Sequence, residues 1–454
     1  MHQADPTTDR VISSVLRYVD YRLRTDDVPL DGQVRSRAEL DSCLGGVIRE
    51  QGRDPDEVLN LYTSVIAPTV LSADSTRFLG FIPAAPTKAS LAFDALASSA
   101  SLQGISWTEA SGIIAAENSV LRIIAEEAGL PPSAGGCFVS GGSAGNLSAL
   151  AVAREVAKSK AGDSSDGRRR TWRVVVGQSA HSSILSTLRL LEMEPLVVHT
   201  PHHRLTAEAL ASALARETDL STVAAVVATA GSANAGMIDD LAGIADLAQE
   251  FGFWLHVDGA YGGAGIFAPS LRHRFRGLER ADSFIVDPHK WMFAPFDSCA
   301  LLYRTPATAR TVHAQRAPYL EVLHANGEWN PSDYAYHLTR RARGLPLWFS
   351  MAVHGVGAYR EAIEASLFLA EATADIVKDT AGLELVCDPD LGVVLFRRLG
   401  WSTADYHDWS AALLTDQIAF APPTTWHGET VARLAFLHPN TSMDIVKTIL
   451  ARMW

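Results

Sequence analysis

The chain has 454 residues, of which 47% are hydrophobic and 20% charged, which is typical of a globular protein with two or three domains. Its formal net charge of -12 at pH 7 argues against a protein that works by neutralising nucleic-acid phosphates or anionic membrane surfaces. The four cysteines lack disulfide or metal-ligand spacing. The polar N-terminus lacks an apolar core of signal-peptide length, and no apolar run has the length of a membrane span. We therefore expect a cytoplasmic protein that acts on small molecules, with no metal, nucleic acid or membrane partner.

Helical periodicity dominates the first part of the chain. Apolar residues such as Val11, Val15 and Tyr18 recur at helical spacing between residues 9 and 70. The run 72–90 is rich in small residues and proline, which is typical of a loop, and a further helical pattern covers 91–130. These patterns predict a helical N-terminal arm over residues 1–85.

Short apolar runs then alternate with helical stretches from about residue 137 onward. This alternation predicts an α/β domain over residues 86–345, with a mostly parallel sheet covered by helices on both faces. The expected strands are 172–177, 194–199, 223–230, 253–258, 282–287 and 299–304. A long helix over 345–379 and strands at 391–399 and 431–438 predict a small C-terminal α+β domain over residues 346–454.

Lys290 follows the predicted strand 282–287 and is itself followed by Trp291, Met292 and Phe293. In an apolar pocket desolvation lowers the pKa of a lysine, and the neutral amine can attack an aldehyde to form a Schiff base. Most lysines after a strand are exposed, so the pattern gains its meaning only from the residues that accompany it.

Asp258 ends the strand 253–258 and runs into a row of small residues that includes Ala260. A carboxylate at the mouth of a parallel strand can pair with the ring nitrogen of pyridoxal 5′-phosphate (PLP), and Ala260 can pack against a flat ring. The alternative is an aspartate that caps a turn.

Two further strand ends carry polar residues. Gly142 and Ser143 lie in a glycine-serine turn before a helix, where free backbone N–H groups can bind a phosphate. His181 begins a helix directly after a strand and can stack on a planar cofactor, although a lone histidine at a helix start is more often a cap or a surface residue.

Together these stretches resemble the group II PLP-dependent amino-acid decarboxylases, the family of the aromatic L-amino-acid and glutamate decarboxylases. The matching motifs are SGGSAGN (140–146), SAHSS (179–183), HVDGAYGG (256–263) and ADSFIVDPHKWM (281–292). The resemblance covers almost the whole chain. It implies a PLP-dependent transferase of fold type I that acts as a homodimer, with the active site at the subunit interface.

The resemblance also implies a role for each matching residue. Lys290 would carry PLP as a Schiff base, Asp258 would pair with the pyridine nitrogen and His181 would stack on the ring. The residues implied as phosphate contacts are Gly142, Ser143 and His289. Asp287 stands where the family often has asparagine, and beside a phosphate its carboxyl would have to be protonated or turned outward.

A tyrosine on a mobile loop takes part in protonating Cα in this family. The corresponding stretch is 319–341, which makes Tyr334 the expected proton donor and Tyr336 its rival.

Substrate contacts are expected from Phe81, Pro83, Gln103 and Ile105, where the family places its pocket. The departures from the aromatic enzymes point to a reshaped pocket; they are Ala73, Gln103, Ile105, Ala84 and Ala233. Gly80 and Phe81 replace an Asn-Gln pair of the glutamate enzymes, which counts against an acidic substrate.

The expected reaction is decarboxylation of an L-amino acid, aromatic or largely apolar, to the amine and CO2. Two alternatives remain open. The same residues would serve a decarboxylation-dependent aldehyde synthase, or another fold-type-I lyase or aminotransferase. A catalytically silent regulatory relative would bind the cofactor without turning over.

Overall fold

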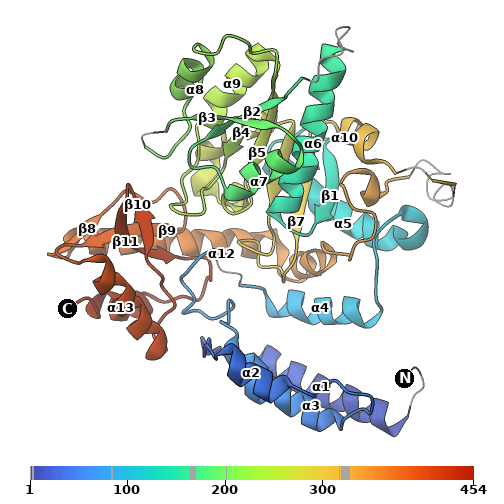
Figure 1. Ribbon diagram of the computed structural model, residues 1–454, viewed down its shortest axis with the longest axis vertical. Helices are drawn as coiled ribbons and strands as arrows, with labels where there is room; N and C mark the ends of the chain where they lie inside the picture. The colour runs from blue at the N-terminus through green and yellow to red at the C-terminus, as the bar shows by residue number, and fades with distance from the viewer. Residues whose placement is uncertain are drawn as a thin grey trace.

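The computed structural model describes residues 2, 5–82, 85–162, 170–200, 202–315, 317–318 and 328–454. Its centre is a seven-stranded sheet in the order β1-β7-β6-β5-β4-β2-β3 (Figure 1). The strands are β1 (Gly135–Val139), β2 (Arg173–Gly177), β3 (Glu194–Val198), β4 (Val223–Thr229), β5 (Trp254–Asp258), β6 (Ser283–Val286) and β7 (Cys299–Tyr303). All neighbours pair in parallel except β7, which is antiparallel to both β1 and β6. The predicted α/β fold with a mostly parallel sheet is confirmed.

Helices cover both faces of this sheet because its strands are buried on both sides. Every residue of β4, for example, is buried. One face packs against α5 (Trp107–Glu127), α8 (Ala207–Leu214), α9 (Leu241–Phe251) and α12 (Leu345–Asp379). The other face packs against α6 (Gly142–Ala161), α7 (Ser182–Leu190) and α10 (Pro306–His313).

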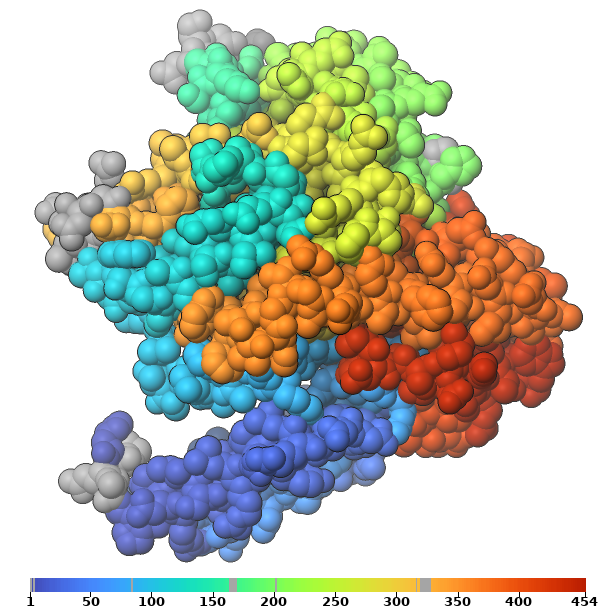
Figure 2. All heavy atoms as spheres, turned by 180° about the vertical axis from the view of Figure 1, so that it is seen from behind, coloured from blue at the N-terminus to red at the C-terminus, as the bar shows by residue number. Residues whose placement is uncertain are grey.

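The N-terminal arm is helical, as its periodicity predicts. It consists of α1 (Pro6–Arg24), α2 (Arg37–Leu44) and α3 (Pro55–Leu61), which lie side by side at one end of the molecule next to α4 (Lys88–Ser99). The helical pattern over 91–130 divides into α4 and α5 instead of forming one helix. In Figure 2 the blue arm stands out from the body of the molecule.

The C-terminal part begins with α12, whose bounds agree with the predicted 345–379. Gly355, at φ +77°, kinks this helix, a conformation that favours glycine. An antiparallel sheet follows, in the order β10-β11-β9-β8, with strands β8 (Leu383–Leu385), β9 (Val393–Arg398), β10 (Thr424–Trp426) and β11 (Glu429–Ala435). It packs with α13 (Thr403–Thr415) and α14 (Met443–Ala451) around its own apolar core. Across the described ranges, we find no helix that is both long and apolar enough to cross a membrane.

A buried ion pair fixes the segment that leads into α12. Arg340 donates two hydrogen bonds to Glu117 of α5, at 2.8 and 2.9 Å, and both side chains are shielded from solvent. Glu117 also accepts the backbone N–H of Gly344 at 2.7 Å. The carboxylate therefore neutralises a buried guanidinium and caps the start of α12 at once.

We expect Glu117→Gln to lower the free energy of unfolding by about 3–5 kcal/mol, because it leaves the Arg340 charge buried without a counter-ion. Urea unfolding followed by circular dichroism measures the change. Glu126→Gln, at an exposed position on the same helix, is the control and should stay within about 0.5 kcal/mol of the wild type. Equal unfolding midpoints for the two variants would contradict the prediction.

Candidate active site

A cavity of about 530 Å³ opens at the carboxyl ends of the parallel strands. This is the place where open α/β sheets bind their ligands. Its lining comes from the loops after β1, β2, β4, β5 and β6. The predicted residues among the lining are Gly142, Ser143, His181, Ala233, Asp258, Ala260, Asp287, His289 and Lys290. The fold therefore brings into one cavity residues as far apart in the sequence as Ser140 and Lys290, 150 positions.

The N-terminus of α6 forms one wall. Gly141 at its N-cap has φ +152°, and no side chain caps the helix. The first backbone N–H groups of a helix have no partner within it, so Gly142 and Ser143 offer donors to an anion. A Cβ atom at Gly142 would lie 3.0 Å from the Cβ of Ala260, tighter than ordinary contact. Glycine keeps this wall close to the cavity floor.

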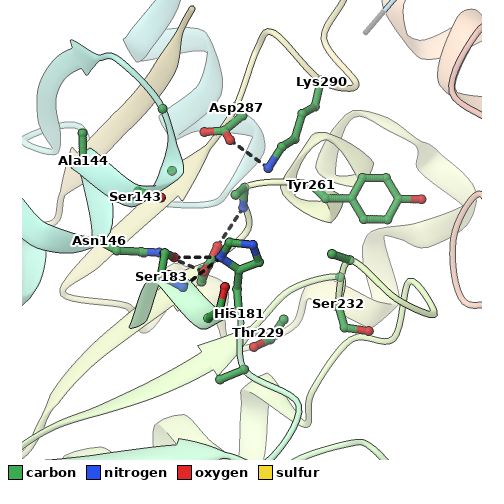
Figure 3. A pocket seen from close by; sticks show the side chains of 18 of the residues that line it. Ser143, Ala144, Asn146, His181, Ser183, Thr229, Ser232, Tyr261, Asp287 and Lys290 are labelled. Carbon is green, nitrogen blue, oxygen red and sulfur yellow. Dashed lines mark hydrogen bonds and ion pairs between the residues drawn. The ribbon is translucent and has the colours of Figure 1, made fainter. Parts of the chain in front are cut away.

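Lys290 reaches into the cavity and forms an ion pair with Asp287, with 2.9 Å between Nζ and Oδ2 (Figure 3). Burial lowers the pKa of Lys290, but the charge and hydrogen bond of Asp287, together with the charge of Asp258, outweigh it and raise the pKa above its usual value. The expectation of a lowered lysine pKa is therefore wrong for the chain without cofactor.

Asp287 is buried and faces the cavity, so an outward-turned carboxyl is excluded. Its Oδ2 bonds to Lys290, whereas its Oδ1 is buried and has no hydrogen-bond partner. The ion pair with Lys290 therefore explains how a buried carboxylate is tolerated at position 287. The sequence had suggested only that this carboxyl is protonated or turned outward.

Asp258 lies at the end of β5 with its carboxylate held from two sides. Asn146 Nδ2 donates to Oδ2 at 3.0 Å, and the backbone N–H of Ala260 donates to Oδ1 at 3.1 Å. Neutral donors on both oxygens stabilise the ionised carboxylate and fix its direction. The side chain lines the cavity at the end of its strand, and it also accepts the N–H of Ala260 in the following turn.

His181 caps α7 and lines the cavity. Its Nδ1 accepts the backbone N–H of Ser183 at 3.2 Å and lies 2.8 Å from Ser183 Oγ. The residue is therefore the helix cap that the sequence allowed, and it also lines the cavity; its stacking on a cofactor ring stays a prediction.

His289 lines the cavity beside Asp287. Its Nδ1 lies 2.6 Å from the carbonyl oxygen of Ser298, and its Nε2 lies 3.7 Å from Asp287 Oδ2. Burial lowers its pKa, and the nearby Asp287 charge opposes this effect only in part. The ring is held in place by its backbone contact and presents Nε2 toward the cavity.

The expected substrate residues do not line this cavity within the chain. Phe81 is 65% exposed and packs near Phe78 and Phe420, while Gln103 is exposed and Ile105 is buried elsewhere. Pro83 and Ala84 lie outside the described residues. Among the predicted pocket positions that the structure describes, the chain brings Ala233 alone to Lys290.

Tyr334 is 4% exposed and its ring stacks on Trp329, with 4.1 Å between the ring centroids. Burial raises its pKa to about 12. It packs in the core between β7 and α6 and does not line the Lys290 cavity, so its position gives no support to the predicted role in proton donation. Tyr336 is 51% exposed and also lies outside the cavity lining.

Several lining residues escaped sequence reasoning, among them Asn146, Ser183, Thr229, Ser232 and Tyr261. Asn146, Ser183 and Tyr261 lie within the quoted motifs 140–146, 179–183 and 256–263, so those motifs could have identified them. Their roles depend on partners that are distant in the sequence. Tyr261, for example, accepts the backbone N–H of Gly392 at 3.1 Å and so ties the site to the C-terminal part.

The cavity fits a flat anion with a basic ring nitrogen. The α6 N-terminus supplies donors for a phosphate, Ala260 supplies a small floor, and Asp258 supplies an ionised carboxylate. Lys290 lies on the same cavity wall, where its amine can reach an aldehyde. These features match the requirements of PLP.

Comparison with known proteins gives the same assignment. The pyridoxal-dependent decarboxylase conserved domain matches residues 46–399. An aromatic-L-amino-acid decarboxylase from Bacillus atrophaeus is 29% identical over 420 residues, which is 89% of this chain and 86% of the relative. An L-2,4-diaminobutyrate decarboxylase from Rhizobium meliloti is 32% identical over 375 residues, covering 79% of this chain and 73% of the relative.

Among solved structures, Oryza sativa TDC with PLP and tryptamine superposes with a TM-score of 0.92 at 21% sequence identity. The match covers 100% of this chain and 99% of the other. At this identity the likeness supports the fold, which is fold type I. With the family match and the cavity around Lys290, it follows that the chain belongs to the pyridoxal-dependent decarboxylases and is a PLP-dependent amino-acid decarboxylase.

Proposed function

We propose that the chain decarboxylates an aromatic or otherwise largely apolar L-amino acid, with Lys290 as the residue that binds PLP covalently. The observation that carries this proposal is the meeting of Lys290, Asp258, His181 and the α6 N-terminus in one cavity. When bound, PLP supplies the electron sink that stabilises the carbanion left at Cα as CO2 departs.

Each protein group has a separate task in this proposal. The N–H groups of Gly142 and Ser143 hold the phosphate, with His289 beside them. Asp258 keeps the pyridine nitrogen protonated, and His181 lies against the ring and excludes water from it. Lys290 is the group best placed to move a proton, because its ammonium lies 2.9 Å from the Asp287 carboxylate, which can stabilise it in the charged form.

The charges in the cavity support an apolar substrate side chain. Among the described lining residues, Asp258, Asp287 and Lys290 are the charged groups, and the other titratable side chains are His181, His289 and Tyr261. All three charges are engaged in the contacts described above. The part of the lining that this chain supplies therefore offers no arginine for an acidic side chain.

A substrate screen tests this choice. Purified holoenzyme is incubated with the twenty common amino acids, ornithine and 2,4-diaminobutyrate, and CO2 and amine are measured. We expect the highest kcat/KM among tryptophan, tyrosine and phenylalanine. Preference for glutamate or 2,4-diaminobutyrate would refute the substrate class, and aldehyde with ammonia and peroxide would refute simple decarboxylation.

We further propose that the enzyme is a cytoplasmic homodimer whose active sites combine residues of both subunits. The arm carries exposed apolar side chains that a partner can cover, namely Val11, Ile12, Val15 and Leu16 on α1 and Val58 on α3. Gln103 and Tyr336 are exposed and lie outside the chain's own cavity. In a homodimer these residues would line the active site of the other subunit. Tyr336 is exposed and Tyr334 is buried, so Tyr336 is the better placed of the two to reach a partner.

Complementation between two inactive variants tests the shared site. We expect Lys290→Ala and Gln103→Trp to be inactive as pure dimers, and mixed dimers to contain one site with neither change. Random pairing makes about half of the dimers mixed, so about a quarter of wild-type activity should return. No recovery from dimers shown to be mixed would mean that each subunit builds its own site.

Asp287 should slow the reaction of Lys290 with PLP by keeping the amine protonated. In Asp287→Asn the pKa of Lys290 falls, because the charge and hydrogen bond that raised it are removed. More neutral amine is then present at pH 7, and recombination of the cofactor-free protein with PLP should accelerate, on the order of tenfold. Stopped-flow absorbance across pH measures this, and the rate profile of the variant should shift to lower pH.

Asp297→Asn is the matched control. That carboxylate pairs with Arg343 at 3.0 Å and does not line the cavity, so its loss should leave the profile in place. Acylation of Lys290 in the cofactor-free protein, followed against pH by mass spectrometry, gives a second reading. An unchanged Lys290 titration in Asp287→Asn would contradict the assignment.

A further inference from the structure

Asn146 lies in the second turn of α6 with 1% of its surface exposed. Its Nδ2 donates to Asp258 Oδ2 at 3.0 Å and to Ser183 Oγ at 3.1 Å. Its Oδ1 lies 2.8 Å from His256 Nε2. Both amide hydrogens and the carbonyl oxygen are thus used, and each reaches a different partner. Figure 3 shows the Asn146, Ser183 and His181 side chains converging below Lys290.

The direction of the amide follows from the chemistry of Asp258. A carboxylate only accepts hydrogen bonds, so Asn146 must present its NH2 group to Asp258 and its oxygen to His256. His256 must then carry a proton on Nε2. Burial lowers the pKa of His256 to about 4, so the ring is neutral and its Nδ1 is an acceptor.

Two buried hydrogen bonds, from Trp254 to Ser283 and between Ser283 and His256, stabilise the His256 tautomer that carries its proton on Nε2. His256 Nδ1 lies 2.8 Å from Ser283 Oγ, and Ser283 Oγ accepts the indole N–H of Trp254 at 2.8 Å. Because Trp254 only donates, the Ser283 hydroxyl is free to donate to His256. The orientation of the Asn146 amide is therefore set from the interior of the sheet, behind the cavity.

The second amide hydrogen of Asn146 is linked to His181 through the hydroxyl of Ser183. Ser183 Oγ accepts from Asn146 and lies 2.8 Å from His181 Nδ1, which also accepts the Ser183 backbone N–H. The serine hydroxyl is thereby directed at Nδ1 of the imidazole. The amide of Asn146 consequently helps to orient two cavity groups, the Asp258 carboxylate directly and the His181 imidazole through Ser183.

We propose that Asn146 is a positioning residue that holds the Asp258 carboxylate and the His181 ring in a fixed mutual arrangement for PLP. The inference rests on the proposed roles of Asp258 and His181 at the cofactor ring. Removal of the amide leaves three buried polar groups without their partner, on Asp258, Ser183 and His256. Such losses reduce binding and catalysis even when the fold is kept.

Asn146→Leu keeps the number and branching of the side-chain heavy atoms and does not lower helix propensity, but it removes every hydrogen bond of the amide. We expect Kd for PLP to rise by about 10–100-fold, and kcat at saturating PLP to fall more than KM changes. Equilibrium titration of the cofactor-free protein with PLP, read by visible absorbance, gives Kd directly and needs no turnover.

Asn146→Asp gives a pH signature that a purely structural role would not produce. Two carboxyl groups at about 3 Å cannot both be ionised, so the pKa of the pair is raised. Below that pKa the new carboxyl is protonated and donates to Asp258 as the amide does; above it the donor is lost. PLP affinity should therefore approach the wild-type value at acidic pH and fall as pH rises. The titratable groups around position 146 are Asp258, His256 and His181, with Lys290 nearby across the cavity.

Asn330→Leu is the matched control, since Asn330 is also fully buried and its Oδ1 accepts the backbone N–H of Trp107 at 2.9 Å, outside the cavity. It should lose thermal stability but keep the PLP affinity and pH profile of the wild type. If Asn146→Leu behaves like this control while Asp258→Asn loses affinity, the inference is wrong. If Asp258→Asn also keeps wild-type affinity and kcat, the proposed role of Asp258 itself fails.

Discussion

Lys290→Ala is expected to abolish decarboxylation and the visible absorbance of lysine-bound PLP. The variant loses the nitrogen that forms the covalent link and the ammonium best placed to move a proton in the cavity. We expect kcat/KM to fall by a factor on the order of 10⁴, since a lost proton-transfer group alone costs about 10²–10⁴. Activity is measured by CO2 release, and the covalent link by borohydride reduction followed by peptide mass spectrometry.

The matched control is Lys158→Ala, which removes an exposed lysine that pairs with Glu155 at 2.8 Å near the far end of α6. It should retain wild-type activity and absorbance. The Lys290 variant should still bind PLP without a covalent bond, because the α6 N-terminus and Asp258 remain in place. A reduced PLP adduct on any other lysine of the variant would refute the assignment of Lys290.

The sequence predicted that Asp258 and Lys290 share a cavity because both stand at the ends of strands in a parallel sheet. Asp258 and Lys290 follow β5 and β6, neighbours whose carboxyl ends meet at one edge. The turn 140–146 follows β1, which lies at the other side of β7. Once the order of the strands is known, motifs at the carboxyl ends of neighbouring parallel strands can therefore be assigned to one cavity.

The antiparallel direction of β7 was less evident from alternation alone. Residues 287–298 join β6 to β7 and contain Lys290 but no helix. A parallel crossover needs about a dozen residues or more and usually a helix, so this connection turns the chain back instead. The loop that carries Lys290 thus also sets the direction of the next strand.

Contacts between side chains could not be predicted in the same way. The raised pKa of Lys290 depends on the direction of the Asp287 carboxylate, which strand periodicity does not specify. Asn146 and Asp258 are separated by 112 positions, and nothing in either motif identifies the other as its partner. Tyr334 was assigned from its place in a loop, whereas its ring packs on Trp329 in the core.

Asp258→Asn is expected to lower kcat by about 10²–10³-fold at saturating PLP, the usual cost of removing one electrostatic contact from a reaction centre. Asparagine has nearly the same shape, so the variant should fold. Its single oxygen can accept from Asn146 Nδ2, and its NH2 group then faces the backbone N–H of Ala260, which loses its acceptor. It lacks the negative charge that keeps the pyridine nitrogen protonated, and the ring becomes a weaker electron sink. Steady-state CO2 release at several PLP concentrations separates this effect from weaker cofactor binding.

Asp282→Asn provides the comparison at the opposite end of the same pair of strands. Its carboxylate accepts the backbone N–H of Leu255 at 2.8 Å and is remote from the cavity lining. Burial raises the pKa of Asp282, so its substitution also tests the loss of a buried acid in general. A kcat within about threefold of wild type is expected for it, well below the cost of a lost transition-state contact. If both variants lose kcat equally, the effect belongs to the stability of the sheet; if only Asp258→Asn does, the charge acts on the cofactor ring.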